Sequence, residues 1–580
     1  MTFAKRLAPL GLAALLLAGS AAPLLAHGVR GHHAPGPAAK AGTGPTAMVA
    51  AANPMAVEAG LKVLKAGGSA IDAAVAVQAV LGLVEPQSSG LGGGAFMTVF
   101  DAKTRRVSAY NGRETAPAAA TPQLFYGPDG KPMNKGQAMV SGRSAGVPGA
   151  VAMLYLAQRQ HGRLAWNTLF TTAEQLAEDG FPAPRRMAEA ANSRAPQAAQ
   201  PDAIAYFTRP DGMKVQPGDT MRNPAYAATL RRIAAEGPRA LLEGPIAEQI
   251  VARLQQGPLP GSMTLQDLAA YKPKAGPAVC RPYRVYVVCV PPAPSGGPAV
   301  LEGLGILERT DIGAHRGDTQ GWYLFSQASR LMYADRDRYF GDPDFVEVPT
   351  EGVLEPAYLD ARARLIDRDR AGPPPTPGKP RGAGVRAPDH TAEPGGTTHF
   401  AIVDRMGNAV SMTTTVESVF GDGRMVAGFF LNNQLTDFSF EPKDGDGAPA
   451  ANAVAGGKRP RSSMAPAIVL DRRGRLVAAV GSPGGPSIIA FNLRALVALL
   501  DWKLPMQEAL ALPNLIAFGN FYATEPAKFA PGVVDGLAAK GVRLSGGSFG
   551  EGSGLHGIEV TPHGLRGGAD PRREGIAKGY

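Results

Sequence analysis

The spacing of apolar residues predicts helices through most of the chain before residue 369. Apolar positions recur with a helical period in 54–66, and Gly67 follows as a stop signal. Ser69 and Asp72 then have the spacing of a capping box at the start of a second helix, "AIDAAVAVQAVLGLVE", which is apolar on nearly every side and should be buried. Further helices are predicted at 148–161, 166–179, 222–236 and 318–338.

From Thr397 onward apolar and polar residues alternate, which predicts β-strands. The segments "TTHFAIVD" and "AVSMTTTVES" flank a turn at "RMGN" and predict a hairpin. Strands at "APAIVLD" and "RLVAAVGS" precede a helix at "PSIIAFNLRALVALLDW", and "GIEVTP" is predicted to be the last strand. Helices and strands in this order predict an α+β fold in which helices flank layered sheets.

A Pro-rich tract at about 370–396 separates the two parts of this pattern. It reads "AGPPPTPGKPRGAGVRAPDHTAEPGG" from residue 371 and shows no apolar period. Proline removes a backbone donor and fixes one dihedral, so such a segment does not form a helix or a sheet easily. A structureless stretch of this length inside one domain predicts that the chain is cut or mobile there.

The first 26 residues have the layout of a secretory signal peptide. Lys5 and Arg6 precede an apolar core, and small residues follow up to Ala26. The apolar core is too short for a stable membrane helix, and the small residues favour removal over an uncleaved anchor. Residues 27–46 are predicted to be a flexible lead-in. We therefore expect an exported protein, periplasmic or secreted, with no membrane span once the signal is removed.

Composition and charge indicate the class of protein and argue against one class of partner. Of the 580 residues 44% are hydrophobic and 19% are charged, which indicates a globular protein. The formal charge of +10 comes from scattered lysines and arginines. Because these do not gather into a basic stripe with interleaved aromatics, no nucleic-acid partner is expected.

The chain has two cysteines, Cys280 and Cys289, in "AVCRPYRVYVVCV". Both lie in strand-like segments on either side of a possible turn. An oxidising compartment would allow a local disulfide across this hairpin, and two buried thiols are the alternative. No Cys–His pattern indicates a thiol nucleophile or a zinc site, and neither a metal nor a cofactor is expected.

The stretch "EPGGTTHFAIVD" begins a buried strand on two hydroxyls. A threonine hydroxyl is a poor nucleophile unless a base lies close, and the α-amine of the same residue can be that base when threonine is the first residue of a chain. This would require cleavage between Gly396 and Thr397. Gly396 could adopt the backbone angles that expose its carbonyl to the threonine hydroxyl. The alternative is two threonines on an ordinary strand, where threonine is common.

Six motifs in order make the chain resemble the γ-glutamyltransferase, or glutathione hydrolase, family of the N-terminal nucleophile hydrolase superfamily. The resemblance runs from about residue 48 to 580, and the motifs read "VEPQSSGLGGGAFM", "GRETAP", "GGTTHFAIVD", "FFLNNQLTDFS", "KRPRSSMAP" and "GSPGG". The resemblance implies a precursor that cleaves itself into a large subunit, 47–396, and a small subunit, 397–580. It also implies that the two subunits jointly form a four-layer αββα sandwich and that Thr397 is the nucleophile.

The resemblance further implies the residues that bind a γ-glutamyl donor, which carries a carboxylate and an amine. The α-carboxylate is expected to bind the guanidinium and hydroxyls of Arg113, Ser462 and Ser463. The α-ammonium is expected to bind Asp437, Gln434 and Glu417.

Three more residues are implied in catalysis. Thr415 is expected to hydrogen-bond to the nucleophile, and Gly484 and Gly485 to offer backbone N–H groups to the oxyanion. The expected donors are glutathione and other γ-glutamyl compounds, with water or an amino acid or dipeptide as acceptor. The segment 438–457 contains no tyrosine and is short for a lid loop, which predicts an open acceptor side.

Two other functions are open at this point. An acylase of the same superfamily, acting on glutaryl amides such as cephalosporin side chains, would use the same nucleophile. Arg113, Asp437 and Glu417 favour a donor with an amine, which a glutaryl group lacks. A non-catalytic periplasmic protein that binds γ-glutamyl peptides is the alternative from another class.

Overall fold

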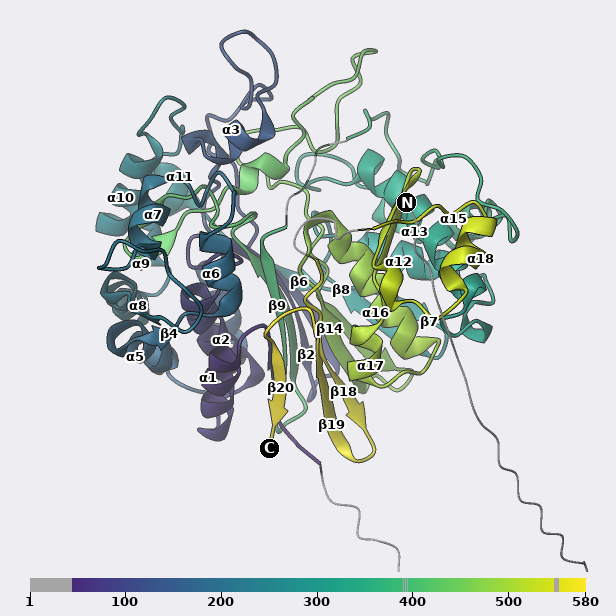
Figure 1. The fold of residues 1–580 in the computed structure, drawn as a ribbon, viewed down its shortest axis with the longest axis horizontal. Helices are drawn as coiled ribbons and strands as arrows, with labels where there is room; N and C mark the ends of the chain where they lie inside the picture. The colour runs from purple at the N-terminus through teal and green to yellow at the C-terminus, as the bar shows by residue number, and fades with distance from the viewer. Residues whose placement is uncertain (1–43, 390, 392, 394, 547–551) are drawn as a thin grey trace, which may run out of the picture. The chain divides into compact units, whose positions relative to one another are not determined.

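A computed structural model describes residues 44–389, 391, 393, 395–546 and 552–580 (Figure 1). The predicted signal peptide at 1–26 lies outside the described residues, as does most of the lead-in at 27–46. Within the described part of the chain, no helix combines the length and the apolar composition needed to cross a bilayer.

The first large sheet has seven antiparallel strands, in the order β20-β1-β9-β10-β2-β3-β6. The predicted hairpin around "RMGN" forms its centre as β9 and β10. The strands are β1 Met48–Ala51, β2 Gly94–Asp101, β3 Arg106–Asn111, β6 Lys274–Pro277, β9 Thr397–Val403, β10 Ala409–Thr415 and β20 Ile576–Gly579.

The second large sheet has six antiparallel strands, in the order β19-β18-β14-β13-β8-β7. Its strands are β7 Val279–Tyr283, β8 Tyr286–Val290, β13 Ala467–Asp471, β14 Leu476–Gly481, β18 His556–Thr561 and β19 Gly564–Ala569. Shorter strands lie outside both sheets: β4 Phe181–Pro182, β5 Thr220–Met221, β11 Met425–Val426, β12 Phe429–Phe430, β15 Leu515–Phe518, β16 Phe521–Thr524 and β17 Ser545–Gly546.

Both faces of these sheets are buried, and side chains alternate between two different cores. In β9, Phe400 and Ile402 pack into a core shared with helices, whereas Ala401 and Val403 pack into a core between the sheets. In β13, Ile468 joins the same core between the sheets. The two-residue side-chain period of a strand explains this division. The two sheets therefore pack face to face.

Helices cover the outer face of each sheet (Figure 1). Two helices, α1 Pro54–Lys65 and α2 Ala70–Val84, share the first sheet's outer core. Three others, α12 Gly297–Leu307, α13 Thr319–Tyr339 and α16 Ile488–Leu500, share that of the second sheet. The layers run helix, sheet, sheet, helix, and the predicted α+β class is confirmed.

The remaining helices connect or flank these layers. They are α3 Lys135–Met139, α4 Ala150–His161, α5 Thr171–Asp179, α6 Arg185–Ala191, α7 Pro201–Phe207, α8 Pro224–Glu236, α9 Arg239–Leu242, α10 Gly244–Leu254, α11 Leu265–Ala270, α14 Thr350–Val353, α15 Pro356–Ala363, α17 Met506–Ala511 and α18 Val533–Ala539. Short 3₁₀ turns include η2 Trp166–Phe170, η4 Gln434–Asp437 and η5 Gly485–Ser487.

Most predicted elements are confirmed, and two predictions are wrong in detail. Ser69 and Asp72 form the capping box of α2, as their backbone N–H groups each donate to the other's side chain. The helix predicted at 166–179 is a 3₁₀ turn followed by α5. "GIEVTP" is not the last strand, because β19 and β20 follow it. Both are short and glycine-containing, and such segments carry little β-propensity.

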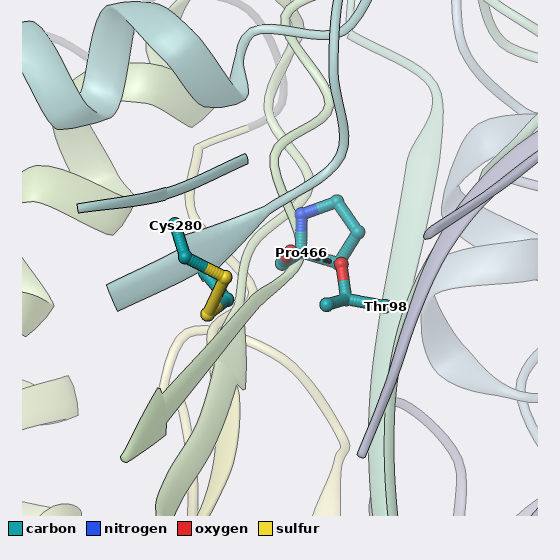
Figure 2. The surroundings of a disulfide bond; sticks show 4 residues. Thr98, Cys280 and Pro466 are labelled. Carbon is teal, nitrogen blue, oxygen red and sulfur yellow. Dashed lines mark hydrogen bonds between the residues drawn. A yellow bond between two sulfur atoms is a disulfide. The ribbon is translucent and has the colours of Figure 1, made fainter. Parts of the chain in front are cut away.

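The predicted disulfide is confirmed and closes the hairpin of β7 and β8 (Figure 2). Cys280 and Cys289 are directly opposite in the register, with their Cα atoms 4.1 Å apart. Figure 2 also shows a bond between the sheets, where the Thr98 hydroxyl donates to the Pro466 carbonyl at 2.7 Å.

The first part of the Pro-rich tract is held against α13 and α15 in this uncleaved chain. Arg330 donates to the carbonyls of Gly372 and Pro373 at 3.0 and 2.8 Å. Tyr339 donates to the carbonyl of Gly378 at 2.6 Å. The tract is thus anchored by side chains at its carbonyls, although it forms no helix or strand among its described residues. Its mobility after cleavage stays a prediction.

Candidate active site

The β9–β10 hairpin places Thr397 and Thr415 side by side. The two residues are register partners at the open end of the hairpin. The Thr397 hydroxyl donates to the Thr415 hydroxyl at 3.2 Å, and the latter donates to the carbonyl of Gly396 at 2.8 Å. One hydroxyl thus touches both the predicted nucleophile and the carbonyl of the predicted scissile bond.

The backbone around this bond is closely packed. A Cβ added to Gly396 would lie 2.5–2.6 Å from backbone atoms of Glu417 and Ser418, so a larger residue does not fit without a backbone shift. The Thr397 carbonyl accepts a hydrogen bond from Arg573 at 2.9 Å. The peptide predicted to be cleaved is therefore held on both sides.

A small cavity adjoins Thr397 and gathers nine of the ten residues predicted to bind the donor or to catalyse. Its free volume is about 20 Å³, little more than the ~10–15 Å³ that one water molecule needs. It is lined by Arg113, Glu393, Thr397, Thr415, Glu417, Gln434, Asp437, Ser462, Ser463, Met464, Gly485 and Ile488.

Gly484 is the predicted residue that does not line this cavity. It directly precedes Gly485, where η5 begins and leads into α16. Both glycines have positive φ, at 133° and 56°. A Cβ on Gly484 would lie 2.6 Å from the ring of Phe491. The turn therefore depends on glycine for both conformation and space.

Arg113 is buried and contacts protein groups in the uncleaved chain. Its guanidinium donates to Asp437 at 2.6 Å and to the carbonyls of Pro460 and Arg461 at 3.1 and 2.7 Å. Here Arg113 therefore orients Asp437, and its contact with a donor carboxylate stays a prediction.

Three acceptor atoms in the cavity lining have no hydrogen-bond partner among the described residues. They are Oε1 of Glu417, Oε1 of Gln434 and Oδ1 of Asp437. The other carboxylate oxygen of Asp437 accepts from Gln434 at 2.7 Å, and that of Glu417 accepts from Asn433. Burial and the nearby Asp437 raise the pKa of Glu417 well above its usual range. Buried acceptors without donors are costly, so this group is suited to a ligand that brings several donors.

The predicted serine pair also lines the cavity. The Ser462 hydroxyl accepts from the backbone of Met464 at 3.1 Å. The Ser463 hydroxyl donates to the Glu393 carboxylate at 2.6 Å and accepts from Arg336 at 2.6 Å. Ser463 is thus already in contact with a carboxylate, one that belongs to the chain itself.

Three further residues lie at this site that the sequence pattern did not predict: Glu393, Arg336 and Arg461. Glu393 is the first residue of the stretch "EPGGTTHFAIVD" and precedes the predicted cut, and Arg461 stands directly before the serine pair. An acidic residue just upstream of a predicted cut was an available signal. Arg336 lies on α13, and no spacing in the sequence connects it with the site.

The chain is similar in sequence to one family of proteins and in structure to a solved acylase. The family model described as gamma-glutamyltranspeptidase matches residues 56–580. The chain is 37% identical to the glutathione hydrolase proenzyme of Bacillus subtilis (strain 168) over 486 residues, 81% of each chain. It is 35% identical to the glutathione hydrolase proenzyme of Escherichia coli (strain K12) over 92% of each chain. It also resembles the crystal structure of a cephalosporin acylase from Bacillus halodurans, with a TM-score of 0.80, 26% identity and coverage of 95% and 99% of the two chains.

Proposed function

The chain belongs to the gamma-glutamyltranspeptidase family, and we propose that Thr397 is the nucleophile with which it hydrolyses or transfers γ-glutamyl groups. The protein is an enzyme with γ-glutamyltransferase and glutathione hydrolase activity. The observation that carries the assignment of Thr397 is the contact of Thr415 with both the Thr397 hydroxyl and the Gly396 carbonyl.

Self-cleavage begins with attack of the Thr397 hydroxyl on the Gly396 carbonyl carbon. The C–N bond then breaks, the amide becomes an ester, and the nitrogen becomes the α-amine of Thr397. Water hydrolyses the ester, which leaves a carboxylate on Gly396 and restores the hydroxyl. The hydrogen bond from Thr415 to the Gly396 oxygen supports this step, because it stabilises negative charge on that oxygen.

In turnover the freed α-amine acts as the base for its own hydroxyl. An α-amine has a pKa near ~8, so a useful fraction is neutral at working pH. Thr397 attacks the γ-amide carbonyl of the donor, the backbone N–H groups of Gly484 and Gly485 stabilise the oxyanion, and the amine leaves with a proton. Water or an acceptor amine then releases the γ-glutamyl group from the ester. With glutathione the first product is Cys-Gly.

The donor's α-ammonium fits the three unpaired acceptors of Glu417, Gln434 and Asp437. An ammonium has three N–H donors, so it satisfies one oxygen from each residue. The donor's α-carboxylate is assigned to Arg113, which also contacts Asp437, and to the serine pair. A glutaryl group has no amine and would leave these oxygens without donors, which favours a γ-glutamyl donor over the acylase alternative.

The mature enzyme is proposed to be an exported complex of two subunits, 47–396 and 397–580. Together they form the four-layer αββα sandwich, and no cofactor enters this mechanism. The Cys280–Cys289 disulfide supports export, since such bonds persist in oxidising compartments.

Replacing the proposed nucleophile tests self-cleavage and turnover together. Thr397→Ala should leave one intact chain on a denaturing gel and abolish release of glutamate from glutathione. Thr398→Ala is the matched control: Thr398 is the buried neighbour on β9, and this variant should still yield two fragments. Mass spectrometry of wild type should place the small fragment's first residue at 397.

The alternatives predict other results. A Thr397→Ala chain that still matures would show that another group is the nucleophile. A wild-type chain that stays intact and binds glutathione without turnover would favour the binding protein. Faster release from a glutaryl amide than from the matching γ-glutamyl amide would favour the acylase.

A further inference from the structure

A second cavity lies at the opposite end of strand β9 from Thr397. Its free volume is about 400 Å³, within the ~300–1,000 Å³ that is usual for small-molecule sites. Val403, the last residue of β9, and Asp404 just beyond it line this cavity. The rise of a strand, about 3.4 Å per residue, places them roughly 20 Å from Thr397. The cavity is therefore separate from the candidate active site.

One end of the apolar core between the two sheets forms the floor of this cavity. Phe100 and Val403 belong to that core, and Leu476 and Leu565 pack against it. These four residues come from four strands, β2, β9, β14 and β19. In Figure 1 the turn between β18 and β19 lies at the lower end of the sheets. A ligand with an apolar body would remove more of this floor from water.

Three arginines stand at the rim of the cavity. Arg105, Arg405 and Arg475 line it and are exposed. Arg105 donates to the carbonyl of Arg473 at 3.2 Å, and Arg405 lies over the ring of Tyr580 at 4.5 Å. Neither Arg105 nor Arg405 forms an ion pair with a carboxylate of any described residue. Both guanidinium groups are thus free to bind an anion.

The turns around the cavity carry an excess of positive charge. In 102–105, 404–408 and 471–475, six cations stand against two carboxylates, namely Lys103, Arg105, Arg405, Arg472, Arg473 and Arg475 against Asp404 and Asp471. Both carboxylates are engaged within their own turns. Asp404 accepts from the backbone N–H groups of Met406 and Asn408. Asp471 accepts from the backbone of Arg475 and pairs with its side chain at 2.7 Å. The local field therefore favours an anionic ligand.

We propose that this cavity is a binding site for a small amphipathic carboxylate, in which an apolar chain or ring carries one carboxylate group. The apolar part lies on the floor, and the carboxylate binds the guanidinium groups of Arg105 and Arg405, whose forked donors match its two oxygens. A wholly apolar ligand would leave the arginines unused, and an inorganic anion would leave the floor uncovered. The lead-in at 27–43 offers no such carboxylate, because it contains Arg30 and Lys40 and no acidic residue.

Calorimetric titration of the purified protein with octanoate and with octanamide tests the need for charge. Octanoate should bind at one site per chain, ~10-fold or more tightly than octanamide, since only the acid offers arginine a charged partner. Arg105→Gln/Arg405→Gln should lower the affinity for octanoate ~10- to 100-fold and leave that for octanamide within about twofold. Arg316→Gln, which removes an exposed arginine outside the cavity lining, should leave both affinities unchanged. Equal affinity of the wild type for acid and amide would overturn the proposal.

Filling the cavity tests the location of the site. Ala102 lines the cavity, so Ala102→Phe should lower the affinity for octanoate ~10-fold or more while the circular dichroism spectrum stays that of wild type. If Ala102→Phe does not fold, Val560→Trp takes its place, because Val560 lines the cavity and is 42% exposed. Unchanged affinity in a folded variant of this kind would overturn the cavity as the site.

A membrane surface is the other partner that a basic face with exposed apolar residues could bind. Cosedimentation with phosphatidylglycerol vesicles separates the two cases. Binding to these vesicles, weakened in Arg105→Gln/Arg405→Gln, without any binding of octanoate would overturn the proposal in favour of membrane docking. Octanoate binding that is weakened by both the arginine variant and the cavity-filling variant supports the small-molecule site.

Discussion

Individual side chains in this site are buried with hydrogen-bonding capacity left unused. Asp437 has one oxygen engaged by Arg113 and Gln434 and the other free of any described partner. The two donors fix the orientation of the carboxylate, so its free oxygen is already aimed when a ligand arrives. Such pre-orientation lowers the entropy that binding costs.

Replacing this carboxylate should weaken donor binding. Asp437→Asn is expected to raise KM for glutathione ~10- to 100-fold, because a charge-assisted bond to the ammonium is worth about 1.5–3 kcal/mol. Steady-state kinetics measure this change. Asp444→Asn, in the loop that follows, is the control and should behave as wild type. An equal loss with a glutaryl amide, which lacks the amine, would argue against contact with the ammonium.

The pH dependence of stability should reveal Glu417. Burial and Asp437 raise its pKa in the folded chain above the usual value near 4.5. Between the two values the unfolded chain has lost a proton that the folded chain keeps, so the free energy of unfolding falls as pH rises through this interval. Glu417→Gln cannot ionise and should flatten that part of the profile. Thermal unfolding at several pH values measures it, and parallel profiles for both proteins would contradict the assignment.

Two hairpins show how local elements position functional side chains and cross-link the chain. The β9–β10 hairpin brings Thr397 to Thr415 through its register alone, because the two residues are directly opposite. The β7–β8 hairpin carries the disulfide, at the edge of the other sheet. Both were predictable, since a hairpin is defined by neighbouring residues and a short turn.

Removing the disulfide should affect stability and not chemistry. A bridge between residues 9 apart is expected to contribute roughly 2–3 kcal/mol by restricting the unfolded chain. Cys280→Ser/Cys289→Ser should therefore lower the midpoint of thermal unfolding, with kcat and KM unchanged because neither cysteine lines the active-site cavity. Differential scanning calorimetry, with reduced wild type as the reference, measures the change. A fall in kcat at temperatures well below unfolding would contradict this separation.

Across the whole molecule, the two proposed subunits share the first sheet strand by strand. β1 from the large subunit lies between β20 and β9, both from the small subunit. β10 from the small subunit pairs with β2 from the large one. The proposed cut at Gly396–Thr397 would therefore divide the chain without dividing the sheet.

The cleaved subunits should stay together without a covalent link. Separation would expose the edges of β1, β9 and β2 and open the cores on both faces of the sheet. Size-exclusion chromatography of the cleaved protein should give one peak with both fragments, and separation should occur only in denaturant, together with loss of the circular dichroism signal. Two separate peaks in native buffer would contradict this interleaving.

The sequence predicted the secondary-structure elements and the residues that line the cavity. It did not predict which of these residues contact one another. Nine of the residues that the resemblance names line one cavity, and each stands in a recognisable motif. The resemblance did not indicate that Arg113 binds Asp437 or that Ser463 binds Glu393, because these contacts depend on tertiary packing between distant segments. β20 also escaped prediction, since "IAKG" is short and gains its stability from pairing with β1.

The position of β1 has a consequence for the timing of maturation. Both of its neighbours in the sheet, β9 and β20, are synthesised well after β1 itself. During synthesis β1 therefore has no partner until β9 has been made, and its other edge stays open until residues 576–579 are present. We therefore expect the proposed self-cleavage to wait for residues 576–579, so a molecule truncated before them would cleave slowly or not at all.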